Sequence, residues 1–347
     1  MKLLVTGHEG YIGSVLVPQL REAGHQVTGL DSGLFRTNAV APLAPVPTIR
    51  KDLRDVELAD LQGFDAVLHL AALSNDPLGN LDPQLTYDIN WHASVRLAEL
   101  AKKAGVSRYL FASSCSVYGV EGGLADEDSP VNPLTAYAES KIFVERDVAR
   151  LASADFTPVY LRCATAYGVS PLTRFDVVVN NFVGCAYQRG KVTLSSDGSA
   201  WRPLVHIRDI NEAYLQLLTA PREAVSNRAF NVGSTKENIR IRDLAEQVKT
   251  IVPGSEVAFA EGASPDKRSY QVNCDRLVQA VPGYRTRWTT ASGARELYDA
   301  FKAGYYGDEP FDSARFIRLK HLERLQREGA LDPSLRFHDG RAPAAAA

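Results

Sequence analysis

The sequence predicts an α/β protein built on a doubly wound parallel sheet, and three observations support this prediction. Short apolar runs rich in β-forming residues alternate with amphipathic helical runs along the first half of the chain. The first run, Lys2 to Thr6, leads through a glycine-rich turn into a helix. The second, Gln26 to Leu30, ends in an acidic residue. Strands that alternate with helices favour a parallel sheet with helices on both faces.

The composition is that of an ordinary globular protein. The chain has 347 residues, of which 45% are hydrophobic and 23% charged, enough for one large domain or two unequal ones. A net charge of −2 and a pI of about 6.4 argue against a nucleic-acid binder. No apolar run is long enough to span a membrane. The four cysteines have no metal-type spacing, so we expect no metal and a reduced, cytoplasmic protein.

The glycine turn predicts a dinucleotide site. Gly7, Gly10 and Gly13 have G-x-x-G-x-x-G spacing, and a helix is expected from about Tyr11 to Ala23. Glycines let the backbone approach a pyrophosphate, and the amino end of the helix supplies N–H groups and positive potential. Asp31, at the tip of the second strand, can accept both hydroxyls of an adenosine ribose. It would repel a 2′-phosphate, which favours NAD over NADP.

Further elements continue the alternation. The segments Ile49 to Leu53 and Asp65 to Ala71 are expected to be the third and fourth strands, followed by a helix over about Asp82 to Ala104 and a strand over Tyr109 to Ala112. Ligands bind beyond the carboxyl ends of parallel strands, so the polar stretch from Ser113 to Ser116 is expected at the site. The other residues expected to contact the cofactor are Tyr11, Ile12, Asp52, Leu53, Leu70, Ala71 and Ala72.

A tyrosine–lysine pair is the first candidate for chemistry. A helix begins near Thr135 and carries Tyr137 and Lys141 at i and i+4, on one face. An ammonium beside a phenol stabilises the phenolate and lowers the pKa of the tyrosine from about 10. Such a tyrosine is a general acid or base for a secondary alcohol. Taken alone, however, an exposed Tyr–Lys helix pair is the commoner explanation.

Taken together, the motifs resemble a known family. The glycine turn GHEGYIG, Asp31, the segment SSCSVYG and the segment YAESK resemble the extended short-chain dehydrogenase/reductases, in particular the NAD-dependent nucleotide-sugar epimerases and dehydratases. The resemblance runs from residue 1 to about 300. It implies a Rossmann-type fold, NAD as cofactor, and Ser114, Tyr137 and Lys141 as catalytic residues. It also implies that Asn90, counted among the cofactor-binding residues, helps to seat the cofactor region.

The residues after Ser114 narrow the reaction. In the family, 4,6-dehydratases carry Asp-Glu at the two positions that here are Cys115 and Ser116, and decarboxylating members keep a Glu where Ser116 stands. Cys115 is one position away from the catalytic cysteine of other members, so we expect it to pack against the cofactor side or to be buried, and not to be the acid/base. The pattern most resembles 4-epimerases, in which Tyr137 would deprotonate the sugar 4-hydroxyl while C4 passes a hydride to NAD⁺. The 4-keto sugar then turns, and the hydride returns to its other face.

The second half of the chain resembles the nucleotide-sugar-binding segments of the family. Residues 194–210 and 265–277 would place Arg202 and Arg268 on the pyrophosphate, where arginine fits in pairs of contacts. A surface ion pair is the alternative for each. Thr165 stands where the family has Asn, and the loop 74–80 either contacts the sugar or is simply solvated. The candidate substrate ligands are Ser74, Asn75, Ser114, Cys115, Ser116, Thr165, Asn180, Asn181, Arg202 and Arg268.

We expect three parts: an NAD-binding domain with the catalytic helix (1–165), a smaller mixed α/β substrate domain with segments that return to the Rossmann core (166–308), and a helical extension with a disordered tail (309–347). The extension is expected to pack on its own domain or on a partner subunit. The resemblance implies a homodimer. The expected activity is inversion of C4 of a nucleotide hexose. The alternatives are an NAD(P)H-dependent 4-ketoreductase and an NAD-binding sensor or scaffold, the latter disfavoured by the intact Ser–Tyr–Lys set.

Overall fold

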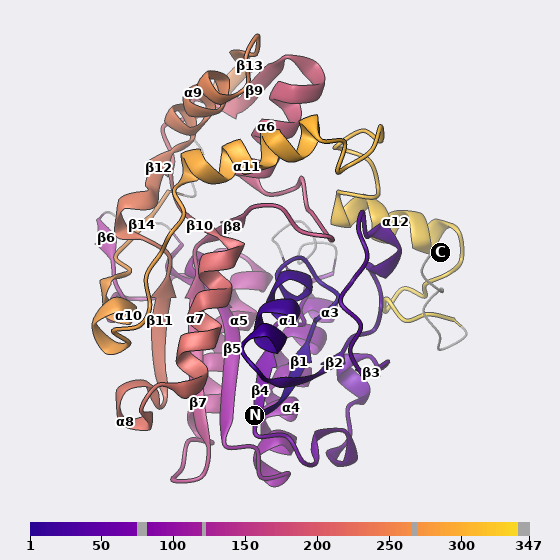
Figure 1. Ribbon diagram of the computed structural model, residues 1–347, viewed down its shortest axis with the longest axis vertical. Helices are drawn as coiled ribbons and strands as arrows, with labels where there is room; N and C mark the ends of the chain where they lie inside the picture. The colour runs from indigo at the N-terminus through magenta and orange to yellow at the C-terminus, as the bar shows by residue number, and fades with distance from the viewer. Residues whose placement is uncertain (75–81, 120–122, 265–268, 339–347) are drawn as a thin grey trace.

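The computed structural model describes residues 1–74, 82–119, 123–264 and 269–338, which form a Rossmann-type core (Figure 1). Its centre is a seven-stranded sheet in the order β11-β7-β5-β4-β1-β2-β3, in which every pairing is parallel. The strands are β1 Lys2–Thr6, β2 Gln26–Leu30, β3 Thr48–Ile49, β4 Ala66–His69, β5 Arg108–Ser114, β7 Thr157–Cys163 and β11 Arg228–Val232. The predicted fold class is confirmed. The strand order reverses between β1 and β4, where such sheets bind ligands.

Helices cover both faces of this sheet (Figure 1). On one face lie α1 Gly13–Glu22 and α7 Ile207–Thr219, and on the other α4 Ala93–Lys103 and α5 Ala136–Ala149. The alternation of side chains along β1 explains the two layers, since Leu3 and Val5 pack into one core cluster and Leu4 into the other. All three side chains are fully buried, as expected of a central strand covered on both sides.

Two predicted elements differ in detail. The strand expected over 49–53 is wrong beyond Ile49, because the Asp52 carboxylate accepts the Arg54 N–H at 2.8 Å and caps a 3₁₀ turn, η2 Leu53–Asp55, instead. The helix expected over 82–104 is present but irregular. It runs as α3 Pro83–Thr86, a π-helical stretch η4 Tyr87–His92, and α4.

A second body of mixed strands and helices lies beyond the carboxyl edge of the sheet (Figure 1). Strand β10 pairs with β8 in parallel and with β12 antiparallel, and β13 pairs with β9. Helices α6, α9 and α11 pack around a separate aromatic-rich core that includes Phe175 and Tyr306. The elements are β8 Thr165–Tyr167, β9 Lys191–Ser196, β10 Trp201–His206, β12 Asn238–Arg240, β13 Glu256–Ser264, α6 Val178–Arg189, α9 Ile241–Ile251 and α11 Thr290–Lys302. The predicted domain boundaries stay a prediction.

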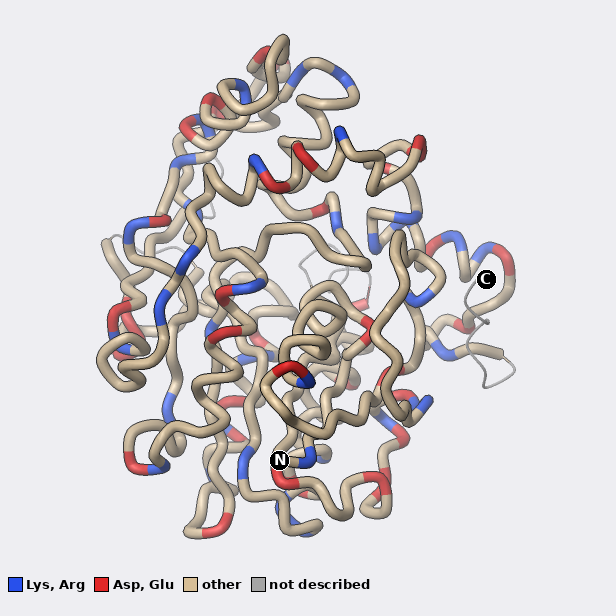
Figure 2. The backbone as a smooth tube through the Cα atoms, in the orientation of Figure 1, with Lys and Arg blue, Asp and Glu red and all other residues tan. Residues whose placement is uncertain are grey.

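Shorter elements lie between those already named. They are the strands β6 Leu124–Ala125 and β14 Gln271–Val272, the helices α8 Arg222–Val225 and α10 Asp275–Ala280, and the 3₁₀ turns η1 Arg36–Asn38, η3 Leu58–Leu61, η5 Cys115–Tyr118 and η6 Thr235–Glu237. Within the described ranges, no helix is long and apolar enough to cross a membrane. Basic and acidic residues are interspersed along the chain (Figure 2).

The C-terminal extension packs on its own chain, one of the two predicted placements. Its helix, α12 Arg318–Arg327, buries Leu322 and Leu325 in a small cluster with Leu73 and Leu85. Phe316, which precedes the helix, joins the second core. The predicted disordered tail, 341–347, lies outside the described residues.

Candidate active site

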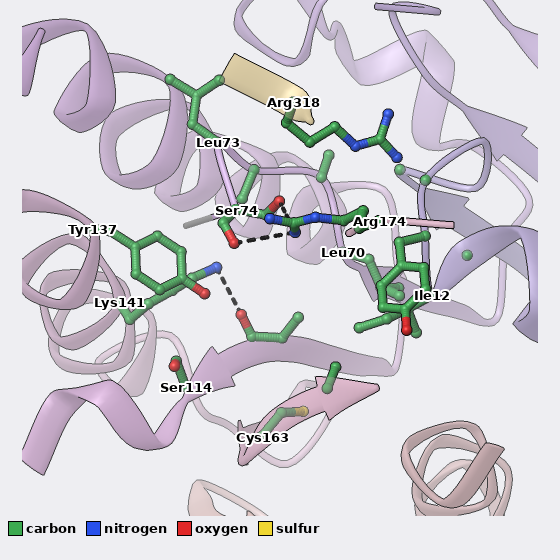
Figure 3. Close-up of a pocket in the computed structure, with 18 of the residues that line it drawn as sticks. Ile12, Leu70, Leu73, Ser74, Ser114, Tyr137, Lys141, Cys163, Arg174 and Arg318 are labelled. Carbon is green, nitrogen blue, oxygen red and sulfur yellow. Dashed lines mark hydrogen bonds between the residues drawn. The ribbon is translucent and has the colours of Figure 1, made fainter. Parts of the chain in front are cut away.

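A cavity of about 580 Å³ opens at the carboxyl edge of the central sheet (Figure 3). Its wall is built from the ends of five parallel strands. Gly7 follows β1, Asp31 follows β2, Leu70 follows β4, Ser114 ends β5 and Cys163 ends β7. The volume is within the range of roughly 300–1,000 Å³ typical of ligand sites. The cavity therefore lies where the topology predicts a ligand.

The glycine turn packs too closely against neighbouring backbone to admit side chains. Gly7 has φ +70°, and a Cβ there would lie 2.8 Å from the Ala71 nitrogen. A Cβ on Gly13 would lie 2.3 Å from the Gly7 carbonyl oxygen. The glycines therefore allow the tight turn that brings Tyr11 and Ile12 to the cavity at the amino end of α1. This arrangement fits the phosphates of a dinucleotide.

Asp31 is held in place by backbone donors. Its carboxylate accepts the Glu9 N–H at 3.1 Å and the Gly33 N–H at 2.8 Å. Burial raises the pKa of Asp31, an effect that the nearby His8 ring and these N–H groups oppose. Both carboxylate oxygens of Glu9 accept hydrogen bonds from the Arg50 guanidinium, at 2.6 and 3.0 Å. Asp31 thus presents a fixed acceptor to the cavity, as an adenosine ribose requires.

The three predicted catalytic side chains face the same space (Figure 3). Lys141 donates through Nζ to the Ala112 carbonyl at 2.8 Å, and Nζ lies 5.4 Å from the centroid of the Tyr137 ring. Burial lowers the pKa of Lys141 to about 8. The Ser114 Oγ accepts hydrogen bonds from the Ser116 backbone N–H at 3.1 Å and the Ser116 hydroxyl at 2.9 Å. Because it already accepts twice, Ser114 is set to donate its own hydroxyl proton.

The residues around Ser114 point in different directions. Ser113 donates to the Glu145 carboxylate, which also pairs with Arg162 at 2.7 Å. Cys115 is fully buried, and its thiol donates to the Arg162 carbonyl at 3.0 Å. Burial raises the pKa of this thiol well above its ordinary value. Tyr118 accepts from the Arg162 guanidinium at 3.0 Å. The prediction of Cys115 as a substrate ligand is therefore corrected, because its side chain turns away from the cavity.

Most of the predicted cofactor residues line the cavity. They are Gly7, Gly10, Tyr11, Ile12, Gly13, Asp31, Asp52, Leu53, Leu70, Ala71, Ala72, Tyr137 and Lys141. Asn90 is the exception. It is buried, its amide oxygen accepts the Leu73 N–H at 2.8 Å, and its amide nitrogen donates to the Leu73 carbonyl at 3.0 Å. Asn90 therefore fixes the backbone after β4 and does not face a ligand.

The predicted substrate residues divide into three groups. Those that line the cavity are Ser74, Ser114, Ser116, Thr165 and Arg202. Asn180 and Asn181 do not face it, which corrects that prediction. Asn180 donates to the Arg174 carbonyl at 2.8 Å and Asn181 to the Phe175 carbonyl at 2.9 Å, so both brace the start of α6. Asn75 and Arg268 lie outside the described residues.

Sequence reasoning missed a buried ion pair in the cavity wall. Arg174 donates to both oxygens of Asp176, at 2.8 and 3.0 Å. It also donates to the Ser74 hydroxyl at 2.9 Å (Figure 3). Arg318, from the C-terminal extension, lies nearby and also lines the cavity. No local pattern places these arginines at the cavity, since Arg174 meets Ser74 from 100 residues away and Arg318 comes from the C-terminal extension. Among the residues that the structure describes, no group of three or more His, Cys, Asp or Glu side chains could hold a metal ion.

Comparison with known proteins identifies the family. A profile of the NAD dependent epimerase/dehydratase family matches residues 3–233. The chain belongs to this family. The membership confirms the predicted family and its cofactor, NAD, and the glycine turn and Asp31 fit that cofactor.

Individual relatives span nearly the whole chain. A UDP-glucose 4-epimerase of Mycolicibacterium smegmatis is 32% identical over 322 residues, which cover 87% of this chain and 99% of that protein. The solved structure of MoeE5 in complex with UDP-glucose and NAD has a TM-score of 0.76 at 27% identity, covering 88% of this chain and 99% of that one. The Thermus thermophilus UDP-glucose 4-epimerase complex with NAD has a TM-score of 0.73 at 27% identity, covering 87% and 99%. The chain is thus similar to NAD-dependent enzymes that modify nucleotide sugars.

Proposed function

We propose that this protein is an NAD-dependent epimerase that inverts C4 of a nucleotide-activated hexose through a transient 4-keto intermediate. One observation supports this proposal above the others. Ser114, Tyr137 and Lys141 face one cavity together with the glycine turn and Asp31, while the two positions after Ser114 carry a buried thiol and a hydroxyl. This set can remove and return an alcohol proton but offers no additional acid for elimination.

The carboxylates that line the cavity are not available to catalyse an elimination reaction. Dehydration needs a carboxylate to take a C5 proton and an acid for the departing hydroxyl. Within the described part of the chain, the carboxylates that line the cavity are those of Glu9, Asp31, Asp52 and Asp176. Asp52 pairs with Arg54 at 2.7 Å. Glu9 and Asp176 are likewise paired with arginines, and Asp31 is held by backbone N–H groups. Each is committed to a structural partner.

Each of the three candidate catalytic residues has a separate role in this reaction. Tyr137 takes the proton from the 4-hydroxyl and later returns it to the 4-keto oxygen. The Lys141 ammonium stabilises the phenolate formed in between. Ser114 donates its hydroxyl proton to the sugar oxygen and fixes its position. When bound, NAD supplies reversible hydride transfer at the same carbon. Because the product has the oxidation state of the substrate, no external reductant is consumed.

Arg202 and Tyr270 are candidates to bind the nucleotide of the substrate. Arg202 lines the cavity, and its Cζ lies 5.9 Å from the centroid of the Tyr270 ring, which suits a diphosphate next to a planar base.

We further propose that the protein is a cytoplasmic homodimer that pairs the helices of the 87–103 and 136–149 segments. On that face Trp91 and Phe143 join the helices with ring centroids 4.7 Å apart, and both rings stay partly exposed.

A direct assay decides between the proposal and its alternatives. The purified protein is incubated with a panel of nucleotide hexoses without added cofactor, and products are identified by NMR. An epimerase interconverts a C4 pair under these conditions. A 4-ketoreductase works only when NAD(P)H is supplied and consumes it stoichiometrically. A sensor or scaffold binds NAD but converts no sugar.

A matched pair of variants links the activity to the site. Tyr137→Phe removes the acid/base and should lower turnover by roughly 10²- to 10⁴-fold, the usual contribution of such a group. Tyr187→Phe alters an exposed tyrosine outside the cavity and should leave turnover unchanged. Equal turnover in Tyr137→Phe and the unmodified protein would contradict the proposed role of Tyr137.

A further inference from the structure

The C-terminal segment 309–338 forms part of the cavity wall, although it lies beyond the residues that the family profile matches. His321 donates to the Leu34 carbonyl at 2.8 Å, in the loop after β2. The Ser334 carbonyl accepts from Arg54 at 2.9 Å. The segment therefore lies over the loops that border Asp31 and Asp52. It contributes Arg318 and Leu335 to the cavity lining.

Arg318 is a buried cation with an unused donor. Only 4% of its surface is exposed, and its Cζ lies 3.9 Å from the centroid of the Phe35 ring. Its Nη2 donates to the Leu172 carbonyl over a long 3.4 Å. Its Nη1 is buried and has no hydrogen-bond partner among the described residues. Such unmet donors are rare in folded proteins and call for a partner.

The charge balance around Arg318 also calls for an anion. The acids that act on Arg318 through their charge are Asp176 and Asp31. Asp176 gives both oxygens to Arg174, and the Asp31 carboxylate accepts from backbone N–H groups. Burial and the repulsion of Arg174 lower the pKa of Arg318 to about 9. A buried cation whose neighbouring acids are already engaged by other donors is costly, and an arriving anion would offset that cost.

The position of Arg318 indicates which anion it would bind. The Leu172 N–H donates to the Ser170 Oγ at 3.1 Å, and Ser170 in turn donates to the Tyr11 carbonyl at 2.8 Å and contacts the Ser14 hydroxyl at 2.9 Å. Arg318 is thus connected through one loop to the first turn of α1. The close-up shows its guanidinium on the same side of the cavity as Ile12 (Figure 3). The amino end of α1 and the guanidinium both favour a phosphate.

We infer that Arg318 binds the pyrophosphate of the dinucleotide, and that the C-terminal segment holds the cofactor in its cavity. A planar guanidinium meets two phosphate oxygens at once, which a lysine does not reproduce. The segment thereby retains NAD between turnovers. This role does not depend on which sugar is converted, so its test needs no sugar.

The test measures binding to the NAD-free, full-length chain by titration calorimetry. Arg318→Met should weaken the binding of ADP-ribose, which carries the pyrophosphate, by roughly 10- to 100-fold, as expected for a lost hydrogen bond to a charged group. The affinity for adenosine, which lacks phosphates, should be unchanged. NAD should leave the holoprotein of this variant faster by a similar factor. Arg327→Met, on an exposed position of the same helix, is the matched control and should behave as the unmodified chain.

Two results would overturn the inference. One is equal affinity of the unmodified chain and Arg318→Met for ADP-ribose. The other is an equal loss of affinity for ADP-ribose and for adenosine, which would mean that Arg318 acts through packing alone. If Arg318→Met does not fold, Arg318→Lys decides in the same way. This variant keeps the positive charge but lacks the paired N–H donors of the guanidinium. It should therefore bind ADP-ribose several-fold more weakly than the unmodified chain and bind adenosine equally well. Unchanged ADP-ribose affinity in Arg318→Lys would then reject the inference.

Discussion

Replacing Lys141, the proposed catalytic lysine, should stabilise the NAD-free protein at neutral pH. Burial lowers the pKa of Lys141 from 10.5 to about 8, and 2.5 units correspond to about 3 kcal/mol. Because the folded pKa lies below the unfolded one, the charged lysine costs stability below pH 8, and this cost disappears as the pH rises towards 10.5. Lys141→Met removes the cost but loses the hydrogen bond to Ala112, worth about 1 kcal/mol. The expected net gain at pH 7 is about 2 kcal/mol.

Urea unfolding of the two proteins across pH measures this effect. The variant should be the more stable at pH 7, and the two curves should cross near pH ~10, where the remaining cost equals the lost hydrogen bond. Lys102→Met is the matched control, since Lys102 also donates to a carbonyl, that of Leu151, but is exposed. Lys102→Met should not stabilise the protein at pH 7. A Lys141→Met protein that is equally destabilised at pH 7 and pH 10.5 would refute the reasoning.

Three further predictions concern the cofactor site and the buried thiol. Gly7→Ala forces an alanine to φ +70° and against the Ala71 backbone, so it should lose about 2 kcal/mol of stability and its bound NAD. Gly24→Ala, where a Cβ meets nothing, should keep its NAD, and NAD content per chain distinguishes the two. Asp31→Asn should bind NAD roughly 10- to 100-fold more weakly and discriminate less against NADP, as titration would show; unchanged discrimination would contradict the role of Asp31. Cys115→Ala should keep its turnover within a few-fold while its free energy of unfolding falls by about 1–3 kcal/mol, and a loss of activity beyond tenfold would place that thiol in the chemistry.

The sequence predicted those parts of the site that rest on local patterns. The strand, glycine turn, helix and Asp31 follow one another within 31 residues, and each leaves a local signature. Tyr137 and Lys141 are four residues apart on one helix, so their shared face follows from helical geometry.

The remaining parts depend on contacts between distant segments. Cys115 was misplaced because the turn after β5, and not its position in the sequence, decides which side chain faces the cavity. Asn180 lies on the buried side of α6, which the register of that helix determines. Arg174 and Ser74 are 100 residues apart, and Arg318 reaches the cavity from an extension outside the family pattern. Only the folded chain brings these groups together.

The most direct test follows the hydrogen on the carbon that is inverted. A nucleotide hexose that the protein accepts is labelled with deuterium at C4 and incubated in ordinary water, without added cofactor. We expect a C4 epimer that keeps the deuterium at C4 and has the mass of its substrate. Loss of the label from C4, or a product lighter by one water, would contradict the proposed mechanism.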